Sequence, residues 1–152
     1  MSDLKQVFRF RHMQPDVVIQ GGWGIYIICH VPTARLYVGS TERSFEQRLH
    51  EHLRMLERGT HPNPPLQTDW TQFGKQQFFL GPAIHMQQSS IRYNSYIFEY
   101  QFDRWVRDTY GPQFLYNVGP MPNGSPKMHE FRYANSVLED YFNGSGVPLY
   151  LR

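Results

Sequence analysis

Cysteine is almost absent from this sequence, because Cys29 is the single cysteine among 152 residues. One cysteine excludes an internal disulfide and a zinc site built from several cysteines. Long hydrophobic runs are missing too, since no apolar stretch approaches the roughly 20 residues that a membrane-spanning helix needs. Residues 1–11 also lack the apolar stretch of a secretory signal. We therefore expect a soluble, intracellular protein with no membrane partner.

Positive charge is in small excess only. The formal net charge is +2 and the pI is about 8.7, a weak signal compared with strongly basic nucleic-acid-binding domains. Composition alone therefore does not predict a nucleic-acid partner. With 152 residues, of which 40% are hydrophobic, the chain is long enough to bury one core, and we expect one domain.

Strand-forming residues gather in three places. Segments 24–31 and 35–39 are rich in Ile, Tyr and Val and flank a Pro-Thr-Ala turn, which predicts an antiparallel hairpin. Segment 77–86 predicts a third strand, in which Gly81-Pro82 indicates a bulge or a sheet edge. Residues 114–118 are expected to return to the sheet.

Two helices are predicted between and after these strands. Ser44 followed by Gln47 resembles a capping box and predicts a helix that runs to about residue 58. The apolar stripe of this helix leaves Arg48 and His52 along one edge, where they would border the core without being buried in it. A second long helix is expected over 91–110, and the proline-rich run 61–65 is interpreted as a break.

The predicted fold is an α+β domain, with a small antiparallel or mixed sheet of three to four strands flanked by helices. A C-terminal helix is expected to begin at Ser125-Pro126, a capping residue followed by proline. We divide the chain into an N-terminal extension (1–22), a core (23–118) and a linker with the C-terminal helix (119–152), all in one compact domain.

A pair of tripeptides carries a family resemblance. Gly24-Ile25-Tyr26, ten intervening residues and Tyr37-Val38-Gly39 resemble the signature of the GIY-YIG nuclease family, with Val38 in place of its isoleucine. The register of Arg48, His52 and Glu99 after these tripeptides makes the match more specific. The resemblance covers about residues 23–118 and is strongest to the catalytic domains of intron-encoded homing endonucleases.

The resemblance implies a metal-dependent endonuclease that hydrolyses DNA phosphodiester bonds at specific sites. Double-stranded DNA is the implied partner, with one Mg²⁺ or Mn²⁺ ion as cofactor. The implied catalytic residues are Tyr26, Tyr37, Arg48, His52 and Asn117, the metal ligand is Glu99, and the candidate substrate contacts are Ser40, His61, Lys127 and Arg132.

The chemistry of phosphodiester hydrolysis agrees with the two charged residue types. A carboxylate oxygen suits Mg²⁺, which often binds through one or two carboxylates plus water and phosphate, so Glu99 alone predicts one ion. Arg48 offers a permanently charged fork of donors that matches phosphate oxygens. The alternatives left open are a solvated helix glutamate for Glu99, and for Arg48 a surface salt bridge with Glu51 or Glu42.

The tyrosines have an ordinary pKa near 10, which a neighbouring arginine or a second tyrosine could lower. By resemblance, Tyr26 orients or deprotonates the attacking water and Tyr37 supports it. Simple strand packing remains the alternative for both rings.

The other polar candidates have supporting roles. His52 would relay a proton or contact phosphate. Asn117 would fix a catalytic side chain or a backbone loop through its amide, with a simple turn as the alternative. Ser40 and His61 would touch DNA or brace the site, and local hydrogen bonding is equally open for both. The remaining histidines show no metal-ligand spacing with cysteine or carboxylate.

Several functional classes stay open. A homing-type endonuclease is favoured, although homing relatives usually carry a long DNA-binding arm and only residues 119–152 follow the core. A short contact by Lys127, His129 and Arg132, or a homodimer, would supply the missing reach. A restriction-type dimer is the second hypothesis, a repair nuclease the third, and a DNA-binding module without catalysis the non-enzymatic alternative.

Overall fold

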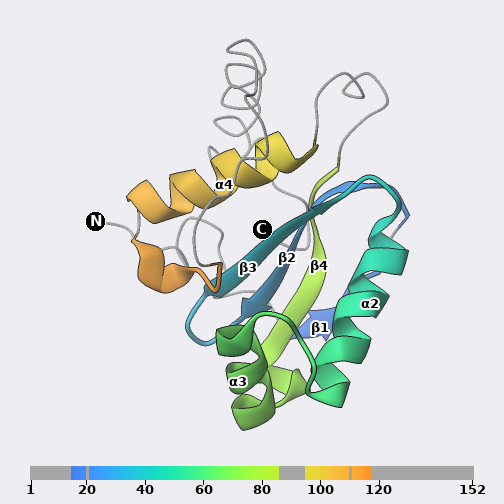
Figure 1. Cartoon of the computed structure of the whole chain (residues 1–152), viewed down its shortest axis with the longest axis vertical. Coiled ribbons are helices and arrows are strands. Elements are labelled where there is room, and N and C mark those ends of the chain that lie inside the picture. The colour runs from blue at the N-terminus through green and yellow to red at the C-terminus, as the bar shows by residue number, and fades with distance from the viewer. Residues whose placement is uncertain (1–14, 20, 86–94, 110, 118–152) are drawn as a thin grey trace.

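The computed structural model describes residues 15–19, 21–85, 95–109 and 111–117 (Figure 1). The expected linker and C-terminal helix, with Lys127, His129 and Arg132, lie outside the described residues. Within the described part, helices α2 and α3 cover one face of a sheet and helix α4 packs against strands β2 and β3 from the other side. The expected α+β class is confirmed. No helix in these ranges is both long and apolar enough to cross a membrane.

The sheet has four strands in the order β1-β4-β2-β3. Strand β2 (Gly24–His30) pairs antiparallel with both β3 (Arg35–Thr41) and β4 (Phe78–His85), which confirms the predicted hairpin and third strand. Strand β1 (Asp16–Val17) adds a short parallel pairing to β4. Every residue of β2 is buried, because neighbouring strands cover both of its edges and helices both of its faces.

The predicted irregularity at Gly81-Pro82 is a bulge. Tyr26 pairs with Pro82 whereas Ile25 pairs with Ile84, so one additional residue of β4 lies between them. Strand β4 is an internal strand, but β1 pairs only with Phe79 and Leu80. Pro82 lies beyond that pairing, where a missing backbone N–H removes no hydrogen bond to β1.

Helix α2 (Phe45–Arg58) begins and ends as its sequence predicts. The Ser44 side chain accepts a hydrogen bond from the Gln47 backbone N–H, and Gly59 ends the helix with a left-handed φ of 75°. The expectation that His52 borders the core without being buried is wrong, since its exposure is 0%. Burial of this polar ring is possible because both of its nitrogens are hydrogen-bonded.

Helix α3 (Pro64–Phe73) begins at the last two residues of the predicted break, 61–65, and is a helix that the sequence interpretation did not include. Asn63 caps the helix, with its side-chain oxygen 3.0 Å from the Leu66 backbone nitrogen, and two prolines fill the first helical positions. Proline suits these positions because its fixed φ is helical and its missing N–H would have had no partner there. Leu66 and Trp70 are buried against the sheet.

The last described part of the chain contains helix α4 (Ser95–Thr109) and a 3₁₀ turn, η4 (Pro112–Phe114). The expected strand over 114–118 is reduced to one bridge between Leu115 and Leu36. Beyond this bridge, the side chain of Asn117 makes the hydrogen bonds to β3 that a strand backbone would make.

Candidate active site

Two tyrosines project from the hairpin toward helix α2. Tyr26 lies opposite Gly39 and Tyr37 lies opposite Ile28, so both rings lie on the same face of the sheet. Tyr26 is 1% exposed and Tyr37 is half-buried. The ring of His52 on α2 lies between them, with centroid distances of 5.2 Å to each tyrosine. The structure therefore brings three of the sequence-predicted residues together.

The hydroxyl oxygen of Tyr26 is the meeting point of two side chains from α2. Nε of Arg48 donates to this oxygen at 3.2 Å, and Nε2 of His52 lies 2.7 Å from it. One helical turn separates Arg48 from His52, which explains why both reach the same atom.

The acidity of Tyr26 differs from the expectation that its neighbours lower it. Burial raises the pKa of Tyr26 above its usual range, and the nearby Tyr37 raises it further. Arg48 opposes these effects but does not overcome them. Tyr26 therefore keeps its proton at neutral pH in this structure.

A second histidine extends the cluster behind His52. Nδ1 of His52 lies 2.8 Å from Nε2 of His61, and Nδ1 of His61 accepts a hydrogen bond from the Asn63 backbone N–H at 3.0 Å. Burial, helped by the positive charge of Arg48, lowers the pKa of His52 to about 3 and that of His61 to about 4. Both rings are therefore neutral at pH 7.

Glu99 reaches the site from α4. Its Oε2 atom accepts a hydrogen bond of 2.7 Å from the hydroxyl of Ser40 on β3. Burial raises the pKa of Glu99, the Ser40 hydrogen bond counteracts this and the nearby Asp103 adds to it. The charge of Glu99 in turn raises the pKa of Tyr37 and, more weakly, that of Tyr26. Glu99 thus belongs to the same electrostatic site as the tyrosines.

A divalent cation fits the chemistry of Glu99. Its carboxylate is partly buried, and burial disfavours its charge more than the arginine of the site favours it. A hard cation bound by one carboxylate, water and a phosphate would supply the missing compensation. The described residues contain no group of three or more His, Cys, Asp or Glu side chains that could hold a metal.

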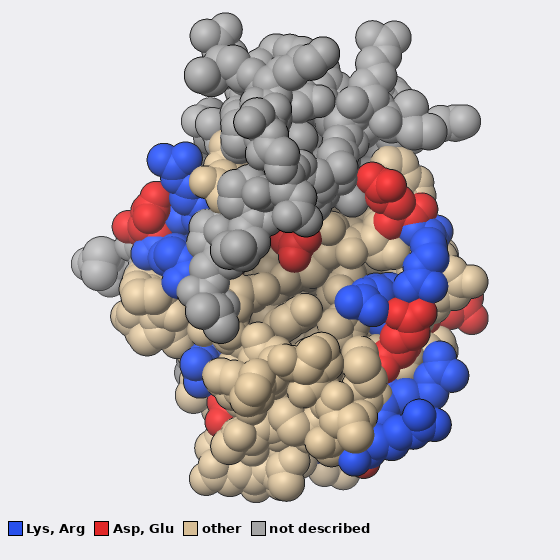
Figure 2. Space-filling model, viewed as in Figure 1, with Lys and Arg blue, Asp and Glu red and all other residues tan. Residues whose placement is uncertain are grey.

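Arg48 also makes the surface salt bridge that was considered as the alternative to a catalytic role. Its Nη1 atom lies 2.8 Å from Oε2 of Glu51, and both side chains are about one third exposed. Arg43 bonds to the same carboxylate, and the two arginines lower the pKa of Glu51. Among the described residues nothing hydrogen-bonds to Nη2 of Arg48. Figure 2 shows blue Lys and Arg side chains along the side of the molecule that α2 forms in Figure 1.

Asn117 holds the backbone of strand β3 at Val38, and fixing backbone is one of the two functions expected for it. Its Oδ1 atom accepts from the Val38 N–H at 2.9 Å, and its Nδ2 atom donates to the Val38 carbonyl at 3.0 Å. Arg107 holds the Asn117 carbonyl at 3.0 Å and is itself paired with buried Asp103. This clamp fixes strand β3 between Tyr37 and Gly39.

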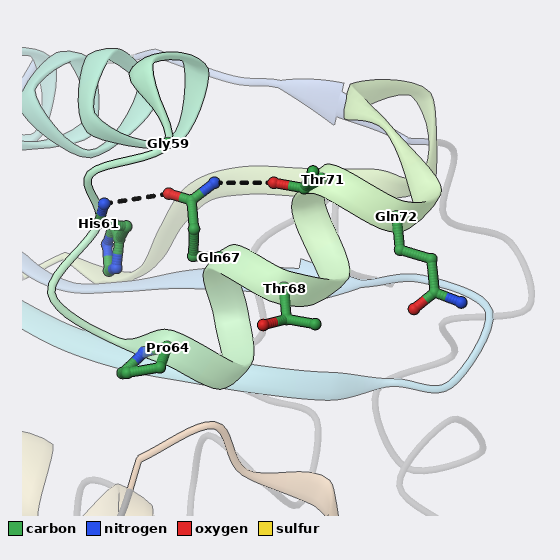
Figure 3. A pocket seen from close by; sticks show the side chains of 7 residues that line it. All are labelled: Gly59, His61, Pro64, Gln67, Thr68, Thr71 and Gln72. Atoms are coloured by element: carbon green, nitrogen blue, oxygen red, sulfur yellow. Dashed lines mark hydrogen bonds between the residues drawn. The ribbon is translucent and has the colours of Figure 1, made fainter.

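Asn63 is a site residue that the sequence reasoning missed. Besides capping α3 and bonding His61, it donates through Nδ2 to the Tyr116 carbonyl at 3.0 Å. An asparagine before two prolines is a helix-start signal, which could have identified this residue. Between the end of α2 and α3, an open pocket of about 580 Å³ reaches His61 (Figure 3). Its other lining residues are neutral: Gly59, Pro64, Gln67, Thr68, Thr71 and Gln72.

The family model of the GIY-YIG catalytic domain matches residues 22–111. The chain belongs to this family. The matched GIY-YIG region includes both tripeptides on paired strands, the tyrosines, the α2 residues and Glu99, and the resemblance seen in the sequence is confirmed. The chain thus contains a GIY-YIG nuclease domain.

Two solved structures are similar to this chain. One is a mutant of the catalytic domain of intron endonuclease I-TevI, with 24% identity and a TM-score of 0.49, covering 69% of this chain and 100% of that one. The other is the catalytic domain of homing endonuclease I-TevI, with 24% identity and a TM-score of 0.46, covering 64% and 98%. Among the curated proteins no match was found.

Proposed function

We propose that this protein is a divalent-metal-dependent endonuclease that hydrolyses double-stranded DNA at specific sites inside the cell, as homing-type enzymes do. The observation that carries the proposal is the convergence of Arg48, Tyr26 and Glu99 from three separate elements on one site. Residues of these types match the needs of phosphodiester hydrolysis, in which water attacks phosphorus and negative charge accumulates on the phosphate oxygens.

Arg48 is the proposed stabiliser of the transition state. Its Nε atom is held by Tyr26 and its Nη1 atom by Glu51, which together restrict the position of the guanidinium. Nη2, which has no hydrogen bond within the described residues, would donate to a non-bridging phosphate oxygen. A donor fixed before the reaction stabilises charge in the transition state without a cost of reorganisation.

Tyr26 is proposed to orient the attacking water or to accept its proton. The Nε–H of Arg48, which donates to this oxygen, would stabilise the phenolate, which is the form able to accept a proton. Burial opposes that form in the free protein. Tyr37 is half-buried beside His52 and is proposed to support Tyr26 or to contact the phosphate.

Glu99 is the proposed ligand for one Mg²⁺ or Mn²⁺ ion, and Ser40 orients its carboxylate. The ion, when bound, would neutralise charge on the phosphate and the leaving oxygen. Ser40 itself, Lys127 and Arg132 remain proposed as DNA contacts, the latter two outside the described residues. The homing type is favoured by the sequence resemblance over about residues 23–118, and a restriction-type homodimer is the second candidate.

The test is incubation of the purified full chain with plasmid and random-library DNA in the presence of Mg²⁺, followed by sequencing of the cut ends. Cleavage at a defined sequence, lost in Glu99→Gln and when the metal is chelated, supports the proposal. DNA binding without cleavage by the parent protein would make it a binding module instead. Sedimentation with and without the cut-site duplex then distinguishes a monomer from a dimer.

A further inference from the structure

A backbone N–H sets the direction of the hydrogen bonds that end at Tyr26. The backbone N–H of Asn63 can only donate, and its nitrogen lies 3.0 Å from Nδ1 of His61. Nδ1 of His61 must therefore carry no proton. A neutral imidazole has one N–H, so the proton of His61 is on Nε2.

The same reasoning then fixes the second ring. Nε2 of His61 donates across 2.8 Å to Nδ1 of His52, which must be unprotonated to accept. The proton of His52 is consequently on Nε2, and this N–H donates across 2.7 Å to the Tyr26 oxygen. Burial and the charge of Arg48 lower the pKa of both histidines, so each ring is neutral and carries one N–H, as this arrangement requires.

The Tyr26 oxygen thus receives two donors, one from His52 and one from Nε of Arg48. Its own hydrogen cannot point at either of them. The hydroxyl hydrogen is left to point away from His52 and Arg48, available to an acceptor.

We infer that His61 is a positioning residue that fixes the tautomer of His52 and thereby the direction of the Tyr26 hydroxyl. His61 was a candidate DNA contact, but it is only 6% exposed and both of its ring nitrogens are engaged within the protein. The catalytic consequence of this inference rests on the proposed function, whereas the tautomer assignment does not.

The position of His61 is held independently of the site. Its backbone N–H donates to Oε1 of Gln67 at 3.0 Å, and the Gln67 side-chain amide donates in turn to Thr71 (Figure 3). The same amide also donates to the Leu56 carbonyl. Asn63, which supplies the directing N–H, is held as the N-cap of α3. The start of α3 therefore determines the hydrogen-bond direction at Tyr26.

The direct test is NMR of the full chain, labelled with ¹⁵N in its histidine rings and measured at pH 7 without DNA. Two-bond proton–nitrogen correlations identify the protonated nitrogen of each neutral ring. We expect protonated Nε2 and bare Nδ1 in both His52 and His61. A proton on Nδ1 of either ring would overturn the inference, whether or not the protein cuts DNA.

Two variants test the consequence. His61→Phe keeps a ring but removes the donor to His52, so part of the His52 population should move its proton to Nδ1. Single-turnover cleavage should fall by about 10- to 100-fold, the scale seen when a partner that orients a metal-ligating histidine is lost, while DNA affinity is unchanged. His61→Gln restores an N–H donor and should recover both the His52 tautomer and the rate.

The control is His50→Phe, since His50 is exposed on α2, the helix that carries His52. An unchanged His52 tautomer in His61→Phe would show that His61 does not direct it and would overturn the inference. If His61→Phe does not fold, the tautomers of the parent and of His61→Gln decide. If the parent shows the expected tautomers but cuts no DNA, the proposed function fails while the assignment stands.

Discussion

Gly39 lies directly opposite Tyr26 in the pairing of β2 with β3, and the Tyr26 ring occupies the space that a side chain at residue 39 would need. A Cβ placed on Gly39 would overlap the Cζ and hydroxyl oxygen atoms of this ring. The second glycine of the motif is thus explained by the first tyrosine, because only glycine leaves room for this ring.

Gly39→Ala should therefore displace Tyr26 from Arg48 and His52. We expect a loss of about 1–3 kcal/mol in the free energy of unfolding, typical of overpacking, and a large fall in cleavage rate. Denaturant titrations and single-turnover rates measure the two effects. Gly21→Ala is the control, since a Cβ there meets nothing within 4 Å. Parent-like cleavage by Gly39→Ala would show that the position of the Tyr26 ring does not matter.

Tyr26→Phe should keep the ring and its packing but lose the hydroxyl, which leaves two buried donors without their acceptor. Cleavage should fall by about two to four orders of magnitude, as for the loss of a positioned acid–base group, while DNA binding persists. Tyr37→Phe should cost less.

Single-turnover rates of both tyrosine variants from about pH 6 to 10, the range around the ordinary tyrosine pKa, measure this difference. The reverse order, with Tyr26→Phe active and Tyr37→Phe inactive, would exchange the two assigned roles. Full activity in both variants would exclude a tyrosine hydroxyl from the reaction.

Glu99→Gln should abolish metal-dependent cleavage and leave the fold intact, because the amide keeps the size and the Ser40 acceptor but loses the charge. Circular dichroism checks the fold, and calorimetric titration with Mn²⁺ checks metal affinity. Glu57→Gln, at an exposed position of α2, is the matched control. Normal cleavage by Glu99→Gln would mean that this carboxylate is not the metal ligand.

Arg48→Ala should lower single-turnover cleavage by at least about a hundredfold, the usual effect of removing one donor that stabilises transition-state charge. Arg48→Lys should restore only part of the rate, because an ammonium group cannot bond Tyr26, Glu51 and phosphate with the geometry of a guanidinium. Arg54→Ala, exposed on the same helix, is the control. Full activity in Arg48→Lys would point to a requirement for charge alone.

The buried histidines predict a loss of stability in acid. In the unfolded chain both histidines bind a proton below their ordinary pKa of about 6.5. In the folded protein the pKa is about 3 for His52 and about 4 for His61, so both rings stay neutral in between. The free energy of unfolding is therefore unaffected by these two histidines above pH 6.5. Below that pH it falls by about 1.4 kcal/mol per pH unit for each histidine.

Urea unfolding of the parent and of His61→Gln between pH 4 and 7 measures this loss. The slope of the free energy of unfolding against pH should show that the variant takes up one proton fewer on unfolding than the parent. Partly buried Glu99 and buried Asp103 have raised pKa values and act with the opposite sign, so the difference between the two proteins is the quantity to compare. Equal slopes would mean that His61 is charged in the folded parent or uncharged when unfolded.

The sequence determined the elements whose signals are local. The hairpin, the start of α2 at Ser44 and its end at Gly59 depend on side chains within a few residues of each other, and all three were predicted. The tripeptides and their spacing to Arg48 predicted the family in the same way, since a motif on paired strands and one helix is a short-range pattern.

Only the tertiary structure decided how far each polar side chain is buried and what it bonds. A helical periodicity placed His52 at the edge of the core, but two strand tyrosines and His61 cover it, and its exposure is 0%. The pKa of Tyr26 likewise depends on desolvation by elements far away in the chain, and desolvation outweighs Arg48. Long-range packing sets both properties, and neither leaves a periodic signal in the sequence.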